Sequence, residues 1–390
     1  MRDVRRIVWS AWMVWLLLFG WAGTAAAQAV TVELLDAPGA QAEAPRSAAV
    51  LARWSAPAPD QPTRVEVPQR PTGHWLRLRV DRDIAASEQR MVEVQCARSY
   101  GAARYYPPGS AQAQSIPLAK GDEPSLLSTA WKLPLREGWR RADAAYFRVP
   151  ALVSCAMQIG FTTQSEVARR DESARRFAIG AYSVLLLMTL FVFGLWLAQR
   201  DPVYLYYCGY LVSISVYMLV LSGWIVIPEH WGSPPARRNG VAWSAATLAT
   251  VFQLLFTVRF LDLPRWLPRT ARFLRALAWT NLAWLAVLVL AFEQTRGFWY
   301  LGGNGLLLLA IPVLLWSAVM VWRRGGEYAG YYLLGWTPLM AFAGMIAAKT
   351  FGIGQAYWPE YGLVLTVVLE SGVLMLALTQ RAAERHRRGQ

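Results

Sequence analysis

The sequence predicts a membrane protein in which an all-β sandwich domain is followed by a seven-helix transmembrane bundle. The second half of the 390-residue chain consists of long apolar segments that short charged turns separate. A helix of about 20 apolar residues crosses a bilayer. Only 16% of the residues are charged, whereas soluble chains carry about 25%. Seven segments have the required length, namely 177–198, 203–227, 241–261, 273–292, 298–322, 328–351 and 357–379.

Residues 1–27 have the pattern of a secretory signal peptide. Arginines near the N-terminus precede the apolar run 7–23, and small residues follow up to Ala27. Such a pattern predicts cleavage after Ala27. The alternative is an uncleaved anchor, because the run is nearly long enough to span. In either case we expect the next segment to face an oxidising compartment.

Residues 28–165 predict the β-sandwich domain. Several short runs are rich in β-branched and aromatic residues or alternate between apolar and polar side chains. In the run 75–80, Leu76, Leu78 and Val80 share one face and Trp75 lies on the other. The predicted strands are 30–35, 50–54, 63–67, 75–80, 91–97, 145–149 and 152–161.

Aromatic side chains on a sandwich can stack against sugar rings, and the alternative for each is a place in the core. The six ligand-binding candidates are Trp54, Trp75, Trp131, Trp139, Tyr105 and Tyr106. Cys96 and Cys155 both lie in predicted strands and are either a disulfide or two buried thiols. The chain holds 3 histidines, so we expect neither a histidine-based metal site nor a cofactor.

The arginines predict the orientation of the bundle rather than a nucleic-acid partner, although the net charge is +14. They gather in the turns that an outside N-terminus places on the inner face, as the positive-inside rule requires. We therefore expect a bacterial inner-membrane protein with a periplasmic N-terminal domain and a cytoplasmic C-terminus. A charged juxtamembrane linker, 166–176, precedes the membrane domain 177–380, and a short basic tail, 381–390, follows it.

Polar residues at membrane depth are the candidates for a transmembrane switch, because they are costly there and often functional. Glu370 lies about 20 Å into the last predicted helix, at 1.5 Å per residue. It is either a switch or a proton-linked site, or it is a protonated residue that makes one interhelical hydrogen bond. Lys349 and Glu360 would pair across a helical hairpin. Asn281 and Asn304 could hydrogen-bond between helices.

Four motifs in the helical half resemble a known family: RDPVYLYY at 200–207, FTVRFLDLP at 256–264, YYLLGW at 331–336 and ESGVLMLALTQR at 370–381. Together they resemble the bacterial seven-transmembrane receptors with diverse intracellular signalling modules. The strand GHWLR at 73–77 resembles the second type of sensor domain of that family, a jelly-roll sandwich for carbohydrate-like ligands. The resemblance implies a sensory receptor.

Members of that family usually continue into a kinase or cyclase module, and no motif of such a module occurs up to Gln390. We therefore expect the receptor to signal through a separate cytoplasmic kinase or diguanylate cyclase. Its helices are expected to contact membrane lipids. A transporter or an accessory subunit for envelope or glycan export is the alternative. An enzyme is not expected, because no nucleophile–base group or paired carboxylate motif is found.

Overall fold

The structure is a computed structural model with two compact units, one built from strands and the other from the helices after Phe177. The described residues are 30–35, 54–55, 64–67, 74–95, 103–110, 112–116, 130–149, 155–221, 234–326, 328–350 and 362–388. The predicted signal peptide, residues 1–27, lies outside them.

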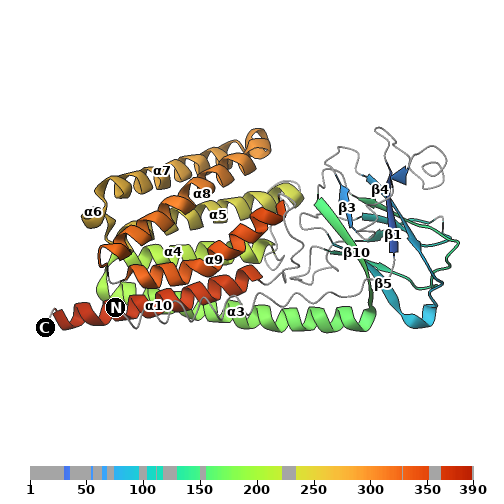
Figure 1. Ribbon diagram of the computed structural model, residues 1–390, viewed down its shortest axis with the longest axis horizontal. Helices are drawn as coiled ribbons and strands as arrows, with labels where there is room; N and C mark the ends of the chain where they lie inside the picture. Colours follow the sequence, from blue (N-terminus) through green and yellow to red (C-terminus); the bar gives the residue numbers. More distant parts are fainter. Residues whose placement is uncertain are drawn as a thin grey trace. The chain divides into compact units, whose positions relative to one another are not determined.

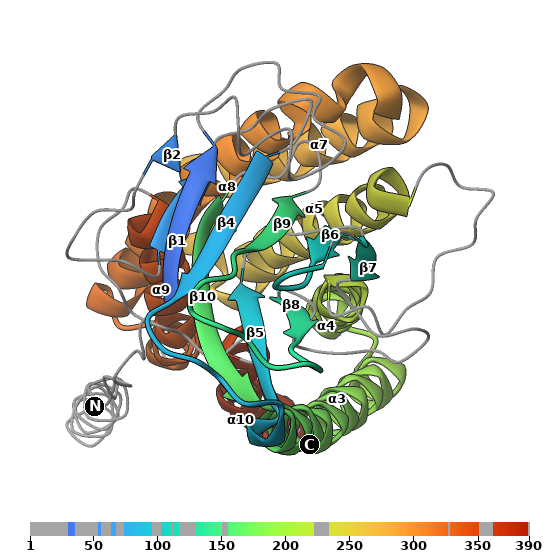
Figure 2. The same cartoon turned by 90° about the vertical axis from the view of Figure 1, so that its right-hand side faces the viewer.

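The β unit contains two sheets in which every recorded strand pair is antiparallel (Figures 1 and 2). One sheet has the order β2-β1-β4-β9-β6-β7, and the other has the order β3-β10-β5-β8. The strands are β1 (Val30–Leu35), β2 (Trp54–Ser55), β3 (Arg64–Val67), β4 (His74–Val80), β5 (Arg90–Gln95), β6 (Ala103–Tyr106), β7 (Gln114–Ile116), β8 (Ala130–Pro134), β9 (Ala145–Val149) and β10 (Cys155–Thr163). A short 3-10 helix, η1 (Ala86–Glu88), precedes β5.

The two sheets share one apolar core, so the unit is a sandwich, as the alternation predicts. Leu76 and Leu78 of β4 are fully buried and pair with Phe147 and Ala145 of β9. The facing sheet contributes side chains such as Val92 and Trp131 to the same cluster. The jelly-roll connectivity stays a prediction.

The helical unit follows the predicted segments closely (Figure 1). Its helices are α3 (Gln164–Gln199), α4 (Pro202–Leu221), α5 (Pro234–Phe260), α6 (Leu263–Trp266), α7 (Pro268–Leu290), α8 (Phe292–Arg323), α9 (Ala329–Thr350) and α10 (Gly362–Arg388). From α4 onward, each long helix contacts the next long one along the chain: α4 contacts α5, α5 contacts α7, α7 contacts α8, α8 contacts α9, and α9 contacts α10. The short helix α6 was not predicted.

Six of these helices are long and apolar enough to cross a membrane, within the part of the chain that the structure describes. They are α3, α4, α5, α7, α8 and α10. Helix α9 covers the remaining predicted segment but does not belong to the six. Large apolar side chains on the bundle are exposed, for example Leu187 at 66% and Leu290 at 86%. Such a surface suits a lipid environment, and the chain is a membrane protein.

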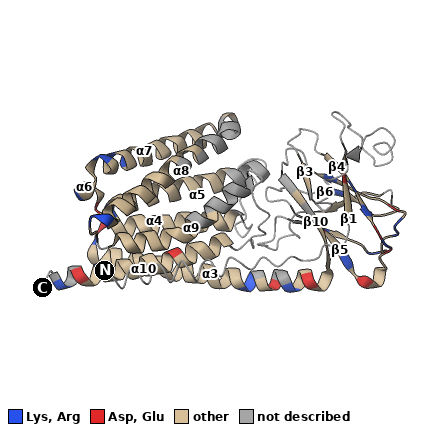
Figure 3. Cartoon of the chain, in the orientation of Figure 1, with Lys and Arg blue, Asp and Glu red and all other residues tan. Residues whose placement is uncertain are grey.

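The predicted linker 166–176 is helical and forms the first part of α3. Its charges lie along this part of the helix, and the later part is apolar (Figure 3). Exposed Glu172 and Arg176 form an ion pair of 2.8 Å at the i, i+4 spacing, which supports an isolated helix by a few tenths of a kcal/mol. The predicted tail 381–390 is likewise helical as far as Arg388, because α10 continues to that residue.

Candidate functional site in the helix bundle

The aromatic ligand candidates of the β unit are buried wherever their side chains are described. Trp75, Trp131, Trp139, Tyr105 and Tyr106 have exposed fractions of 0–5%. Trp131, Trp139 and Tyr105 belong to the common core. A sugar needs an open ring face, and these three side chains take the alternative place in the core.

Trp75 and Tyr106 form a separate pair on the opposite face of the six-stranded sheet. Their neighbours Leu76 and Tyr105 point into the core, and side chains alternate along a strand. The two ring centroids are 5.6 Å apart, and the Arg148 guanidinium lies 5.6 Å from the Trp75 ring. Among the aromatic candidates with described side chains, these two lie outside the common core.

Several other candidates lie outside the described part of the chain, wholly or at the level of the side chain. Cys96 and Glu360 fall outside the described residues. Trp54 in β2, Cys155 in β10, Asn304 in α8 and Lys349 in α9 have described backbones only. The disulfide and the Lys349–Glu360 pair therefore stay predictions.

Glu370 is fully buried in α10 and is bonded to another helix. The Tyr210 hydroxyl of α4 donates a hydrogen bond of 2.7 Å to Glu370 Oε2. The second carboxyl oxygen, Oε1, has no hydrogen-bond partner among the described residues. One carboxyl group thus joins α4 to α10 through one oxygen and leaves the other unmatched.

Aromatic and hydroxyl groups surround this carboxyl from three helices. Tyr207 and Tyr210 of α4 have ring centroids 6.0 Å apart, and both lie near the Glu370 carboxyl. Tyr332 of α9 lies near the carboxyl as well. Ser371, the next residue of α10, is fully buried and donates to the carbonyl oxygen of Val367 at 2.6 Å.

Helix α5 closes the same region through Thr257. Its hydroxyl donates to the Gln253 carbonyl oxygen at 2.8 Å and lies 2.8 Å from the Tyr332 hydroxyl. Because a threonine hydroxyl has one hydrogen, Tyr332 is the donor of the second bond. The tyrosine therefore ties α9 to α5, as Tyr210 ties α4 to α10.

An ionised carboxylate is expensive in this setting. Glu370 has one hydrogen bond, and the described groups around it are phenols, hydroxyls and apolar side chains rather than cations. Burial of an unpaired charge costs several kcal/mol, so the neutral acid is the favoured form. The group can take up or release a proton, or it can change its hydrogen-bond partner when helices move.

Asn281 does not belong to this cluster. It is buried in α7, and its side-chain amide donates to the Leu277 carbonyl oxygen of the same helix at 2.8 Å. The predicted interhelical bond is therefore replaced by a bond within α7.

Sequence reasoning missed three tyrosines of the cluster, namely Tyr207, Tyr210 and Tyr332, because tyrosines near helix ends ordinarily form an interfacial belt. The i, i+3 spacing of Tyr207 and Tyr210 in α4 is the sequence signal that these two side chains share one face of the helix.

A second polar cluster lies at one end of the bundle around Asp201, which precedes α4. Its buried carboxylate accepts from the backbone N–H of Val203 at 3.1 Å. Arg259 of α5 and Arg381 of α10 lie 3.8 and 4.0 Å from its oxygens. Arg381 also donates to the Phe260 carbonyl oxygen at 3.0 Å. These contacts hold α4, α5 and α10 together at this end.

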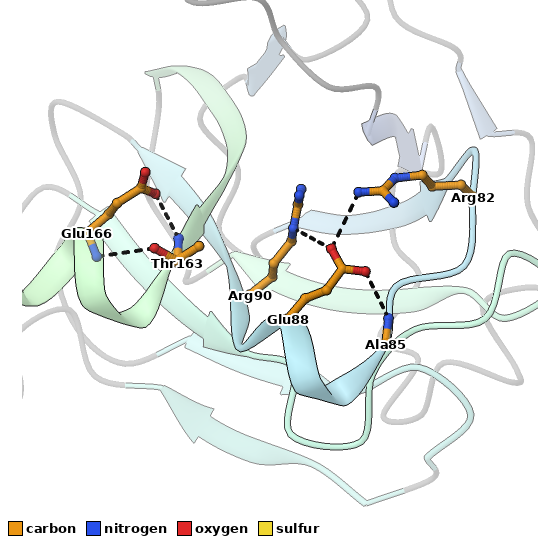
Figure 4. A network of polar contacts seen from close by, with 6 residues as sticks. All are labelled: Arg82, Ala85, Glu88, Arg90, Thr163 and Glu166. Atoms are coloured by element: carbon orange, nitrogen blue, oxygen red, sulfur yellow. Dashed lines mark hydrogen bonds and ion pairs between the residues drawn. The ribbon is translucent and has the colours of Figure 1, made fainter.

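The start of α3 is fixed by a reciprocal cap (Figure 4). The Glu166 carboxylate accepts from the Thr163 backbone N–H at 3.1 Å, and the Thr163 hydroxyl accepts from the Glu166 backbone N–H at 3.2 Å. The Thr163 bond lowers the pKa of Glu166. The Gln164 N–H donates to the Gln89 carbonyl oxygen at 3.2 Å, so the cap is attached to the turn before β5.

The same turn is held by Glu88, which bonds on both sides of η1 (Figure 4). Its carboxylate lies 2.9 Å from Arg90 and 3.4 Å from Arg82, and it accepts from the Ala85 backbone N–H at 3.2 Å. The strand β10 therefore passes into α3 through a corner that these hydrogen bonds and ion pairs hold.

No group of three or more His, Cys, Asp or Glu that could hold a metal ion occurs within the described ranges.

Comparison with known proteins gives one family. The model for the domain described as 7TM diverse intracellular signalling matches residues 176–381, more than half of the chain. No curated protein matches.

Proposed function

The chain belongs to the 7TM diverse intracellular signalling family and is a membrane receptor with a signalling role, and on that premise we propose how it signals. The β unit binds a small ligand in the periplasm of a bacterial cell. The helices pass the change to a separate cytoplasmic protein, a kinase or a diguanylate cyclase. Glu370 is the polar switch point of this transmission.

The buried bond between Tyr210 and Glu370 carries the proposal. It joins α4 to α10 at full burial, and its energy depends on the relative position of the two helices. Glu370 Oε1 is unmatched among the described residues, so a second arrangement that gives it a donor would gain a hydrogen bond that this one lacks. A ligand shifts such an equilibrium by its differential affinity for the two states.

The corner between β10 and α3 supports a mechanical input from the β unit. Helix α3 starts at Gln164, the residue after the end of β10, and a cap that Gln89 contacts fixes that start. A change in the sheet at this corner would therefore move the first turn of α3 directly. A coupling role for residues 166–176 fits a helix better than a loose connector.

The chemical class of the ligand is proposed only in part. Three of the aromatic candidates are core residues, which removes their support for a carbohydrate. Trp75 and Tyr106, with Arg148 beside them, keep an aromatic and cationic patch that would suit a carbohydrate-like or anionic small molecule if they were uncovered.

A complementation experiment in the native host tests the switch. A deletion strain receives the wild-type chain, Glu370→Gln, Tyr210→Phe or the control Thr366→Val, and transcript profiles are compared at equal membrane levels. Thr366 is a buried residue of the same helix, and its bond among the described residues stays within that helix, to the Leu363 carbonyl oxygen at 2.8 Å. We expect the first two variants to share an altered profile and the control to match the wild type.

A wild-type profile for Glu370→Gln would contradict the switch role. Purification of the tagged chain from native membranes in mild detergent tests the output separately. Enrichment of a kinase or cyclase over a control membrane protein supports signalling in trans. Enrichment of envelope-synthesis or transport proteins alone would favour the accessory-subunit alternative.

A further inference from the structure

A pocket of about 350 Å³ opens at one end of the bundle, among the ends of α5, α6, α8, α9 and α10. It is distinct from the Glu370 cluster, because its lining includes Phe260, Trp266, Tyr328 and Glu384 but none of the residues around that carboxyl. Its volume lies in the range of ligand sites, about 300–1,000 Å³.

The lining residues lie where the helices leave the apolar layer. The apolar span of α5 ends at Phe260, that of α8 at Arg323 and that of α10 at Glu384. Charged residues gather at this end of the bundle, and the middle of the helices is almost free of them (Figure 3). The pocket therefore lies at the level of lipid headgroups.

The pocket presents equal numbers of cationic and anionic side chains. Arg265 and Arg381 provide the cations, and Asp262 and Glu384 provide the carboxylates. Glu384 is oriented by the Tyr328 hydroxyl, which donates to its Oε2 at 2.6 Å. Arg381 is oriented by its bond to the Phe260 carbonyl oxygen at 3.0 Å. Both charges are thus held in place on the walls.

The remaining two charges are exposed at the corner between α5 and α6. Neither Asp262 nor Arg265 takes part in a recorded ion pair with another described residue. The Arg265 guanidinium lies 5.8 Å from the Trp266 ring, and the Arg381 guanidinium lies 5.9 Å from the Tyr328 ring. The aromatic rings of the pocket wall therefore make cation–π contacts, the kind of contact that an ammonium group can also make.

A balanced set of charges is complementary to a ligand that carries both signs. A guanidinium binds a phosphate through strong charge-assisted hydrogen bonds. A carboxylate and an aromatic face bind a primary ammonium. We propose that this pocket binds a phosphate and a primary ammonium joined in one zwitterion, the headgroup chemistry of phosphatidylethanolamine. Basic pockets between membrane helices hold anionic headgroups, whereas this one adds two carboxylates.

Such a headgroup would bridge the α5–α6 corner and α10. Its phosphate would contact Arg265, and its ammonium would contact Glu384. Because both helices also carry residues that pair with Asp201, the lipid would strengthen the association of α5 with α10. This inference does not depend on the receptor's ligand or on its cytoplasmic partner.

Nanodiscs provide the test with the full-length chain. The protein is reconstituted in phosphatidylcholine alone, with added phosphatidylethanolamine, with added phosphatidylglycerol, or in phosphatidylcholine with soluble phosphoethanolamine. Thermal stability and retained lipid, by native mass spectrometry, are measured. We expect phosphatidylethanolamine to raise the midpoint temperature of thermal unfolding and to remain bound to the protein. Protection by phosphoethanolamine would assign the site to the free headgroup compound, and protection only by the lipid would assign it to the membrane.

Variants separate the pocket from the general charge of this end. Arg265→Gln and Glu384→Gln should each reduce retained phosphatidylethanolamine roughly tenfold, the loss expected for one charge-assisted contact. Arg265→Lys should restore part of it. The control is Arg272→Gln, an exposed arginine of α7 that does not line the pocket.

Equal stability in all lipids, equal retention of phosphatidylglycerol, or an equal effect of Arg272→Gln would overturn the proposal.

Discussion

Tyr210 and Glu370 are 160 residues apart in the chain, and a buried hydrogen bond of 2.7 Å joins them. The bond closes the contact between the helix that follows the first span and the last helix of the bundle. Its donor is a phenol, and its acceptor is a carboxyl group with no other recorded partner among the described residues. Removal of either partner therefore leaves the other without a match in the bundle interior.

Tyr210→Phe is expected to destabilise the bundle by about 1–3 kcal/mol, because Glu370 then loses its donor. A double-mutant cycle with Glu370→Leu, which removes the acceptor oxygens, is measured by unfolding in mild detergent and gives the coupling energy. Thr366→Val is the matched control and should show no coupling with Tyr210→Phe. Additive effects of the two substitutions at Tyr210 and Glu370 would show that the bond does not form.

The cap at the start of α3 predicts a dependence on pH. The Thr163 backbone N–H that donates to Glu166 lowers the pKa of that carboxyl below its ordinary value of 4.5. A depressed folded-state pKa stabilises the helix start above the unfolded value, and the gain is lost as pH falls through the folded value. Hydrogen exchange of the full chain near Gln164 should accelerate over this acidic range, after correction for intrinsic rates.

The Glu166→Gln variant should lack that acidic change. Thr163→Ala should cost about 1 kcal/mol at neutral pH, since it removes the N-cap oxygen. Ser173→Ala, at an exposed position further along α3, is the control. Equal protection in Thr163→Ala and the wild type would argue against the cap.

Gly209 is predicted to be essential for the packing of α4 on α5. A Cβ atom at this position would lie 2.8 Å from the Phe252 ring. Gly209→Ala should destabilise the protein by about 1–3 kcal/mol, because such overpacking forces side chains from their rotamers. Phe252→Leu in the same chain should recover part of the loss in thermal unfolding. Gly180→Ala, where nothing lies within 4 Å of the added atom, should show no loss.

Tyr105→Phe is expected to leave stability unchanged or to raise it by up to about 1 kcal/mol. The Tyr105 hydroxyl is buried without a partner among the described residues, and such a group is costly. Burial raises the pKa of this phenol above its ordinary value of 10.0. Because the raised folded-state pKa favours the neutral form, wild-type stability should fall as pH rises above 10.0.

Unfolding curves of Tyr105→Phe and the wild type at neutral and alkaline pH check this. The variant should lose less stability at high pH than the wild type. A loss of more than about 1 kcal/mol at neutral pH would indicate that the hydroxyl has a functional partner.

Sequence reasoning located the elements with strong periodicity and missed those without it. The alternation in 75–80 and the apolar length of the membrane segments predicted β4 and the spans. The strands β7 and β8 are sheet edges, are 3 and 5 residues long, and so carry little pattern. The charged run 169–176 concealed the first part of α3, because a solvated helix needs no apolar stripe.

Sequence reasoning predicted that Glu370 lies deep in the membrane, but it did not predict which residues contact it. The position of Glu370 within an apolar segment was enough to single it out. No local pattern could pair it with Tyr210, because packing between distant helices decides that contact. The aromatic candidates of the β unit show the converse, since residue type alone does not separate a core ring from a ligand-binding ring.

The corner at Thr163 also fixes the residue from which the turns of α3 are counted. An α-helix turns by about 100° for each residue, and α3 is helical over its 36 residues. An insertion or deletion of one residue after the cap would therefore turn every later side chain of α3 about the helix axis by that angle. Chimeras that join another β-domain to this bundle must keep the number of residues between the cap and the apolar part of α3.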